Sequence, residues 1–216
     1  MKGVLDAAAP QLHVQFHATQ ALLKSIAAGE SADVVILTTA GIDELVQQGK
    51  VVAASRVELG SSGVGLAVRA GASKPNIGSL QELKDALLAA SSVAHSRMGA
   101  SGIYFAQLIE RLGIAERLKK RVIVEKGPVA AAIARGEAEL GAQLLCELAP
   151  VPGIDIVGPL PDEVQKSSVF AAAVMSGSAK RAAAQAFLDF LGTAAVQAAM
   201  RKSLFIPAPR SPRRRE

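Results

Sequence analysis

A loop rich in small residues and hydroxyl groups leads directly into a helix-period segment at residues 95–113, HSRMGASGIYFAQLIERLG. Ser96, Gly99, Ala100 and Ser101 precede the apolar positions of the expected helix. The first turn of a helix presents unpaired N–H groups and about half a positive charge, so it attracts anions without needing lysine. Two hypotheses follow: the loop is an ordinary helix start, or it holds an anionic ligand.

Two further loops have the same uncharged, small-residue character. Ala18 and Thr19 follow a strand-like segment, and Thr38 and Thr39 follow the apolar run ADVVILT. We expect Thr19, Thr39 and Ser101 each to stand at a helix N-cap, where a hydroxyl either caps the backbone or contacts a ligand. Parallel α/β sheets bind ligands where their strands end and helices begin, so these loops are candidate ligand-binding positions.

The familiar catalytic motifs do not fit the sequence. The segment GASGI around Ser101 lacks the second glycine of a G-x-S-x-G nucleophile elbow. Gly49 and Lys50 lack the earlier glycine of a phosphate-binding loop, and GSSGVG at 60–65 opens a strand rather than a helix. No paired carboxylates stand out. The residues therefore favour binding over catalysis, and we predict a protein that is not an enzyme and needs no cofactor.

Metal ligation is not expected either. His13, His17 and His95 are far apart in the sequence and lack nearby carboxylates, so they are interpreted as loop or surface residues. Cys146 is the only cysteine, which excludes an internal disulfide and a thiolate cluster. It is interpreted as a small core residue.

The net charge of +5 is a property of the C-terminal end. Residues 201–216 carry six of the 24 Lys and Arg residues and one of the 19 acidic residues, so residues 1–200 are electrically balanced. With only 3% aromatic residues as well, nucleic-acid binding is not expected. Residues 208–216 are predicted to form a disordered basic tail. The opening MKGVLDAAAP is not a secretory signal, which predicts a cytoplasmic protein if Met1 is the true start.

Short apolar runs alternate with helix-period segments, which predicts an α/β fold built from parallel βαβ units. Strands are expected at 12–16, 32–38, 63–71, 92–96, 121–126, 140–145, 154–160 and 169–175. Helices are expected at 19–30, 39–50, 79–90, 101–112, 127–139 and 178–193. Ser79 with Glu82 three residues later has the spacing of a capping box, and it is interpreted as a purely structural helix start.

The two segments GVGLAVRAGASKP (63–75) and VFAAAVMSGSA (169–179) are alike in composition and enclose a self-sufficient β-α-β-α-β block. If both are crossover strands, residues 72–166 form lobe II, and residues 1–71 with 167–207 form a discontinuous lobe I. This predicts a two-lobed protein with a ligand cleft.

The order of several landmarks resembles the bacterial extracellular solute-binding proteins of the molybdate-binding type, from about residue 4 to residue 207. These landmarks are AAGESADVVILT, IDELVQQGKVVAASRVELGSSGVGLAVRAGASKP, SGIYFAQLIERLGI, ARGEAELGAQ and VPGIDIVGPLPDEVQ. The resemblance implies the type II periplasmic-binding-protein fold, with two crossover strands and a cleft that closes on its ligand. It also implies a periplasmic component of an ABC importer that presents molybdate, tungstate or a related oxyanion to a membrane permease.

Members of the molybdate type hold their dianion with hydroxyls and backbone N–H groups. Carried over position by position, the implied ligand-binding residues are Ala18, Thr19, Thr38, Thr39, Ser96, Gly99, Ala100, Ser101, Gln143 and Ser168.

The chain departs from the molybdate-type pattern in three places. The family's first strand, expected before MKGVLDAAAP, is missing; the loop before SGIYF is shorter; and Ser168 or Val169 stands where a tyrosine is usual. Three alternatives therefore stay open beside the receptor: a ligand-sensing domain of a cytoplasmic regulator, a truncated non-functional copy, and an enzyme on the same fold.

Overall fold

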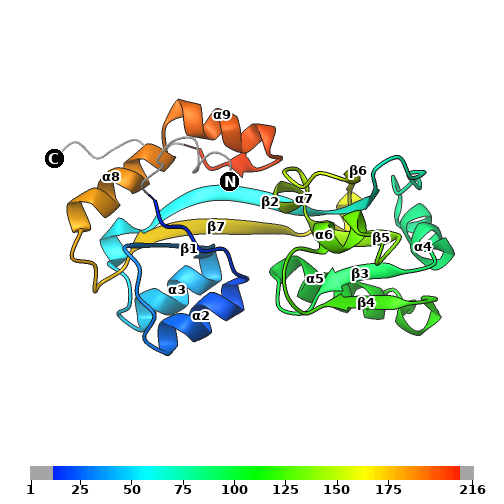
Figure 1. Ribbon diagram of the computed structural model, residues 1–216, viewed down its shortest axis with the longest axis horizontal. Coiled ribbons are helices and arrows are strands. Elements are labelled where there is room, and N and C mark those ends of the chain that lie inside the picture. Colours follow the sequence, from blue (N-terminus) through cyan, green and yellow to red (C-terminus); the bar gives the residue numbers. More distant parts are fainter. Residues whose placement is uncertain (1–11, 210–216) are drawn as a thin grey trace. The chain divides into compact units, whose positions relative to one another are not determined.

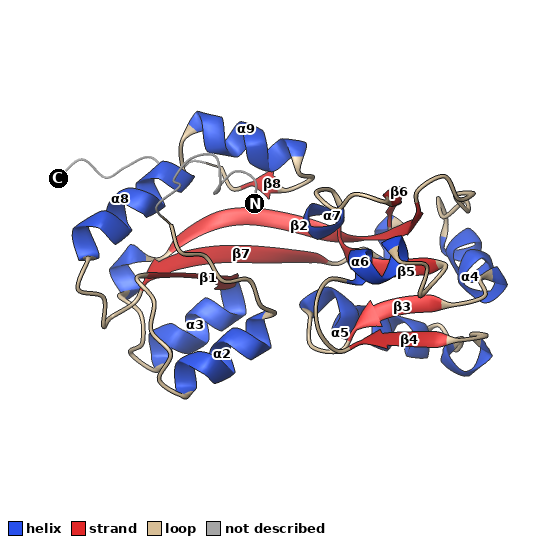
Figure 2. Cartoon of the chain, in the orientation of Figure 1, coloured by secondary structure: helices blue, strands red, loops and turns tan. Residues whose placement is uncertain are grey.

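The computed structural model describes residues 12–209, and it contains the mixture of helices and strands expected of an α/β protein (Figures 1 and 2). The helices are α2 (Thr19–Ala27), α3 (Thr39–Gln47), α4 (Leu80–Ala89), α5 (Ala100–Arg111), α6 (Val129–Ala134), α7 (Leu145–Leu148), α8 (Arg181–Leu191) and α9 (Ala194–Lys202). The strands are β1 (Val34–Thr38), β2 (Val57–Arg69), β3 (Val93–Ser96), β4 (Arg121–Val124), β5 (Leu140–Leu144), β6 (Ile154–Pro159), β7 (Ser167–Val174) and β8 (Ile206–Pro207). The predicted α/β class is confirmed.

Among the described residues, contacts divide the chain into two units. Unit 1 comprises residues 12–13, 21–61 and 169–209, and unit 2 comprises residues 14–20 and 62–168. Strand β2 carries the chain from unit 1 into unit 2, and β7 carries it back, so these are the two crossover strands expected from the sequence. The domain limits drawn from the sequence, 71/72 and 166/167, stay a prediction. Most of the predicted basic tail, from residue 210, lies outside the described residues.

Unit 1 is built on antiparallel pairing of β1 with β7. The residues of β1 alternate between half-buried and buried, so one face of the strand is directed into a core. That core is formed by small and branched apolar residues of β1, β7, α2 and α3: Leu23, Ile26, Val35, Leu37, Ile42, Leu45, Val51, Ala171, Ala173 and Met175. The short strand β8 pairs with the part of β2 that belongs to unit 1.

Unit 2 contains the parallel part of the sheet, in which β3 pairs with both β4 and β5. Ala94 packs in the cluster that contains α6, whereas the next residue, His95, packs on Phe105 of α5. Because successive strand residues point to opposite faces, α5 and α6 cover opposite faces of this sheet. Helix α6 lies so close to β5 that a Cβ at Gly141 would sit 2.8 Å from the Val129 side chain.

This parallel arrangement decides where a site can form. Helices α5, α6 and α7 follow β3, β4 and β5 in the chain, so all three begin at the same edge of the sheet. That edge is where α/β proteins bind ligands. We call it the β3–β5 edge.

Several predicted elements need correction. The segment 12–16 forms no strand, and the helix expected at 127–139 is limited to Val129–Ala134. Strand β2 begins at Val57, six residues earlier than expected. The helices α7 and α9 were not predicted.

Ser79 behaves as predicted. It is the N-cap of α4, and its hydroxyl oxygen accepts from the backbone N–H of Glu82 (3.3 Å). No helix within residues 12–209 is both long and apolar enough to cross a membrane.

Candidate functional site

The head of α5 is the first component of the candidate site. Gly99 is the N-cap residue in an extended conformation, and no side chain caps the helix. The first intrahelical bond runs from Ile103 N–H to the Gly99 carbonyl (2.9 Å). Ser101 is the second residue of the helix and is buried, with 3% of its surface exposed. The positive end of the helix dipole is therefore left without a capping side chain.

Ser96 lies so close to this helix head that residue 102 must be a glycine, and the space at Gly99 is restricted as well. A Cβ at Gly99 would sit 2.5 Å from Ser96 Oγ, and a Cβ at Gly102 would overlap the carbonyl oxygen of Ser96. The tight approach brings the Ser96 hydroxyl onto the first turn of α5. A hydroxyl and uncapped helix N–H groups form a neutral donor set suited to an anion.

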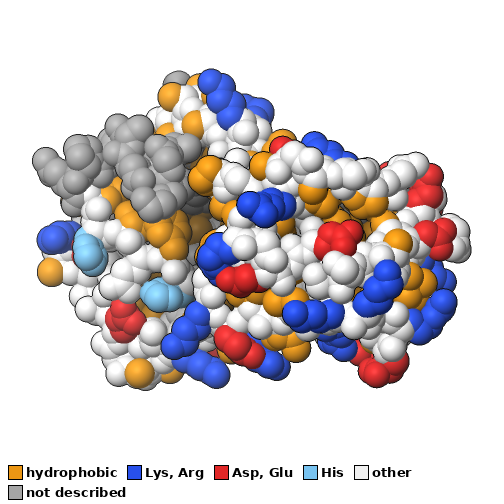
Figure 3. Space-filling view, turned by 45° about the vertical axis from the view of Figure 1, so that its right-hand side comes forward, with side chains coloured by type: hydrophobic (Ala, Val, Ile, Leu, Met, Phe, Trp, Pro, Cys, Tyr) orange, Lys and Arg blue, Asp and Glu red, His pale blue; other side chains and the backbone are white. Residues whose placement is uncertain are grey.

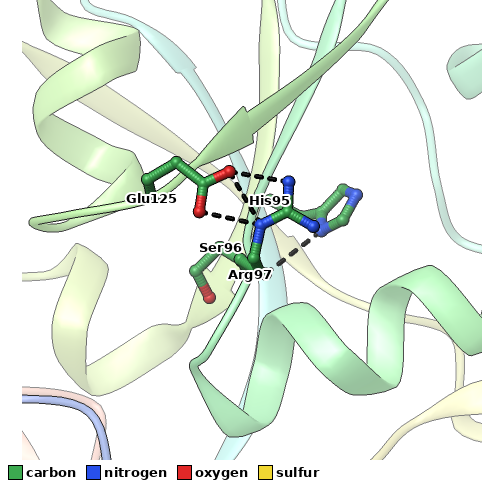
Figure 4. Close-up of polar contacts among 4 residues, drawn as sticks. All are labelled: His95, Ser96, Arg97 and Glu125. Atoms are coloured by element: carbon green, nitrogen blue, oxygen red, sulfur yellow. Dashed lines mark hydrogen bonds and ion pairs between the residues drawn. The ribbon is translucent and has the colours of Figure 1, made fainter. Parts of the chain in front are cut away.

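An arginine also belongs to this loop. Arg97 and Glu125 come directly after Ser96 and Val124, which are register partners in β3 and β4. Arg97 Nε donates to both carboxylate oxygens of Glu125 (2.7 Å each), as Figure 4 shows. The hydrogen bond from Arg97 is the main cause that lowers the pKa of Glu125. Both side chains are more than half exposed, so the pair can open at little cost.

Gln143 lies at the end of β5 and is buried, and its amide is held from two sides. Its Oε1 accepts from the backbone N–H of Ala130, in the first turn of α6 (3.0 Å). Its Nε2 donates to Glu147 Oε2 (2.9 Å). The Ala130 N–H can only donate, so the amide oxygen must face it, and the amide N–H groups are thereby directed at Glu147.

Glu147 is exposed and lies in the short helix α7. No Lys, Arg or His within residues 12–209 forms an ion pair with it. Desolvation of the carboxyl group by the protein packed around it is the main cause that raises the Glu147 pKa, and the hydrogen bond from Gln143 acts in the opposite direction. Among the described residues, Glu147 is thus a carboxyl group without a counter-charge, and its orientation is set by a neutral amide.

Strand register brings these components together. The pairs of β3 with β5 are Val93 with Leu140, Ala94 with Gly141, and His95 with Ala142. Ser96 and Gln143 are the residues that directly follow the last of these pairs, and neighbouring strands lie about 4.8 Å apart. Of the residues predicted from the sequence, Ser96, Gly99, Ala100, Ser101 and Gln143 therefore gather at the β3–β5 edge of unit 2.

His95 is a core residue of unit 2. It is 4% exposed and packs on Phe105, with ring centroids 6.0 Å apart, so its interpretation as a loop or surface histidine is wrong. Nδ1 contacts the Ser96 carbonyl (3.2 Å), and Nε2 is buried without a hydrogen-bond partner. Burial is the main cause that lowers the His95 pKa, followed by the charges of Arg121 and Arg97. The ring is therefore neutral and donates through Nδ1.

Within the described part of the chain, no group of three or more His, Cys, Asp or Glu residues is placed to hold a metal ion. Cys146 is half-buried, and its backbone N–H donates to Ser62 Oγ (3.0 Å). Burial raises the pKa of the Cys146 thiol to about 11, so it is protonated at neutral pH and a poor nucleophile.

The predicted helix caps need correction at all three positions. Thr38, not Thr39, is the N-cap of α3, and its Oγ1 accepts from the backbone N–H of Gly41 (3.4 Å). Thr19 is the first residue of α2, and the N-cap of α5 is Gly99 rather than Ser101.

The remaining predicted residues are divided between the units. Thr38 and Thr39 belong to unit 1, and Ala18, Thr19 and Ser168 belong to unit 2. Ala18 and Ser168 are half-buried, the latter within β7. Arg97 and Glu147 were missed by the sequence interpretation. The expectation that ligands bind where the parallel strands end could have identified both residues, because each lies within four residues of the end of a strand.

The fold is that of a solute-binding protein. The family model for bacterial extracellular solute-binding proteins matches residues 9–205, and the chain belongs to this family. Its fold is the predicted type II periplasmic-binding-protein fold. The periplasmic molybdate-binding protein of Azotobacter vinelandii matches with a TM-score of 0.78 at 19% identity, covering 97% of this chain and 96% of that one. A periplasmic thiamin-binding protein matches with a TM-score of 0.71 at 20% identity, covering 98% and 78%.

A curated relative is more similar in sequence. A Pseudomonas protein named aconitate isomerase is 40% identical over 195 residues, which are 89% of this chain and 74% of the relative. The two solved structures differ in the solutes that their names give, and at about 20% identity their likeness establishes the fold alone.

Proposed function

We propose that this chain binds a small polycarboxylate of the aconitate type through the β3–β5 edge. The observation that carries the proposal is the uncapped head of α5, which Ser96 approaches closely at Gly99 and Gly102 and to which Arg97 is adjacent. The helix N–H groups and the serine hydroxyls would hold one carboxylate, and Arg97 would hold a second.

The Arg97–Glu125 pair supports a carboxylate over a tetrahedral oxyanion. Arg97 Nε already donates to both oxygens of a carboxylate at 2.7 Å, so the position accepts this planar, two-oxygen group. Glu125 is exposed and is held by a weak surface pair, so a ligand carboxylate can replace it. The name of the 40% identical relative favours the same ligand class. Molybdate and tungstate, implied by the resemblance in the sequence, are the competing ligands.

Because the chain belongs to this family, we propose that the protein is the periplasmic component of an ABC importer and delivers its solute to a membrane permease. A second candidate function is isomerisation of the bound polycarboxylate. It is favoured by the name of the relative and by Glu147, a carboxyl group at the same edge that forms no ion pair with any residue of the range 12–209.

Calorimetric titration decides the ligand class. The full chain is titrated with cis-aconitate, trans-aconitate, citrate, molybdate, tungstate and sulfate in separate experiments. We expect at least one aconitate isomer to bind at least about tenfold more tightly than any inorganic oxyanion, a difference of about 1.4 kcal/mol. Binding of every carboxylate weaker than about 1 mM, or tighter binding of molybdate, overturns the proposal.

Replacing one arginine tests the carboxylate contact directly. Arg97→Ala is expected to weaken aconitate binding by about tenfold or more, because a charge-assisted pair is lost, and to leave weak oxyanion binding almost unchanged. Arg135→Ala is the matched control. Arg135 forms a similar exposed pair with Glu137, but at the C-terminal end of α6, away from the β3–β5 edge. Equal effects of the two variants would contradict the assignment.

A further inference from the structure

The carboxyl group of Glu147 is poised for proton transfer. We propose that Glu147 is the general base that moves a proton within the bound polycarboxylate, and that Gln143 is its positioning residue. This inference rests on the proposed function, because it requires an aconitate-type ligand at the β3–β5 edge. It assigns to the chain a catalytic residue for a 1,3-proton shift.

The first argument is orientation. The Gln143 amide cannot rotate without losing both of its hydrogen bonds, since Oε1 is committed to Ala130 N–H and Nε2 to Glu147 Oε2. Gln143 is 7% exposed, so water does not readily replace these partners. One oxygen of Glu147 is therefore fixed by Gln143, while no hydrogen bond from the described residues engages the second oxygen. Such an arrangement holds a general base in a defined position.

The second argument is location. Ser96 and Gln143 directly follow His95 and Ala142, the last paired residues of β3 and β5, and Ser96 lies against the head of α5. A ligand that is held by the Ser96–Ser101 loop lies one strand away from the residue that orients Glu147. The anion-binding groups and the base thus belong to the same edge of one rigid sheet.

The third argument is charge. A carboxylate with a structural role normally has a cation beside it, as Glu125 has Arg97. Glu147 has only the neutral amide of Gln143 among the described residues. Its protein surroundings raise its pKa, which brings a carboxyl group closer to the range where it both accepts and returns a proton near neutral pH.

The chemistry needs no further reagent. Aconitate carries a methylene group beside a carbon–carbon double bond. The Glu147 carboxylate removes one methylene proton, and the electron pair of that C–H bond forms a new double bond to the central carbon. The original π pair moves to the far carbon and its carboxylate, as in a dienolate. The protonated Glu147 then returns the proton to the far carbon, so one C–H bond breaks and one forms. The double bond has changed position, and its geometry can change with it.

The binding groups also stabilise the intermediate. The negative charge of the dienolate accumulates on a carboxylate oxygen. Helix N–H groups and Arg97 aimed at that oxygen would stabilise it more than the ground state, which is how fixed dipoles accelerate enolisation. The same donors would therefore serve both binding and the proton shift.

The test separates binding from chemistry. In D2O, proton NMR follows incorporation of deuterium into the aconitate methylene group and the appearance of the other isomer, while calorimetry gives the affinity of the same samples. The wild-type chain is expected to do both reactions. Glu147→Gln is expected to bind aconitate as tightly as the wild type or more tightly, because a negative charge is removed, and to lose at least about 100-fold in both rates. Glu147→Asp keeps a carboxyl group and is expected to retain measurable exchange.

Gln143→Met distinguishes positioning from mere stability. Removing the Gln143 hydrogen bond raises the pKa of Glu147 further, so the pH at which kcat reaches half its maximum is expected to move to higher values. A purely structural defect would lower kcat without moving this pH. Glu116→Gln is the matched control, because Glu116 is an exposed carboxylate in the turn after the C-terminal end of α5. It is expected to behave as the wild type.

Each outcome decides between the two proposals. If the wild type binds aconitate but catalyses neither exchange nor isomerisation, the proton-transfer role is wrong and the binding proposal stands. If no aconitate binds, the proposed function itself fails. If Glu147→Gln exchanges deuterium within about threefold of the wild-type rate, another group is the base. If Glu147→Gln does not fold, Glu147→Ala takes its place, and an exchange rate within about threefold of that of Glu116→Gln excludes Glu147 as the base.

Discussion

Replacing Gly102 with alanine is expected to destabilise the protein, although alanine is the better helix former. Gly102 is the third residue of α5 and is buried. A Cβ at this position would overlap the carbonyl oxygen of Ser96 and lie 2.7 Å from its carbonyl carbon. These are backbone atoms at the end of a paired strand, so they cannot turn aside as a flexible side chain would. The loop and the helix must separate.

Two opposing effects set the magnitude. Helix propensity alone would stabilise the Gly102→Ala variant by about 1 kcal/mol. Overpacking at a buried position costs about 1–3 kcal/mol, and contact with rigid backbone favours the upper end of that range. We therefore expect a net loss of about 2 kcal/mol in the free energy of unfolding. For a chain of this length, that is a decrease of about 4–8 °C in Tm.

Urea denaturation followed by circular dichroism measures the effect, and calorimetry with aconitate measures its consequence for the site. Because Ser96 must move, affinity is expected to fall together with stability. Gly177→Ala is the control, since no atom lies within 4 Å of a Cβ there. A Gly102→Ala variant that is as stable as the wild type, or more stable, would refute the claim that Ser96 is held against the helix head.

Three further outcomes are expected. The pKa of His95 is lowered in the folded protein, so on acidification the unfolded chain, in which the pKa is near 6.5, binds the proton first. The free energy of unfolding should therefore decrease as the pH falls below about 6.5. In urea melts between pH 7.5 and 5.5, His95→Phe should make this pH dependence weaker. Cys146, with a pKa of about 11, should react with a thiol-specific disulfide reagent at pH 8 far more slowly in the folded than in the urea-unfolded chain. Ser79→Ala should cost about 1 kcal/mol of stability, through loss of the α4 cap, and leave aconitate affinity unchanged.

Local sequence patterns predicted those helices and strands whose apolar faces pack against another part of the protein. The segment LHVQF shows why a pattern is insufficient: Leu12, Val14 and Phe16 alternate as in a strand, yet they are 38%, 36% and 52% exposed, and no strand forms there. Alternation specifies a face, but only a neighbouring strand completes the hydrogen bonds. The helix expected at 127–139 ends early because Gly136 adopts φ +77°, a left-handed conformation that terminates helices.

The site was predicted at the level of loops but not of individual roles. The strand-end rule led to Ser96 and Gln143, which the structure places at the β3–β5 edge, because the rule depends only on chain order and parallel pairing. The caps were misplaced by one or two residues, because the start of α5 is determined by the close approach of Ser96, which no propensity encodes. The Arg97–Glu125 pair joins residues 28 positions apart and exists only through the register of β3 with β4.

The step from receptor to isomerase is small in this architecture. A binding loop that holds a carboxylate with fixed N–H groups already stabilises the charge that forms when a neighbouring C–H bond is broken. What a receptor lacks is a base, and a base at the β3–β5 edge needs only a carboxyl group without a counter-ion. Within the part of the chain that the structure describes, Glu147 meets that condition, because Gln143 orients it without neutralising it. Introducing a cation, as in Gln143→Lys, would lower the Glu147 pKa and weaken the base. Binding would then improve while isomerisation declines, a divergence that a purely structural carboxylate would not produce.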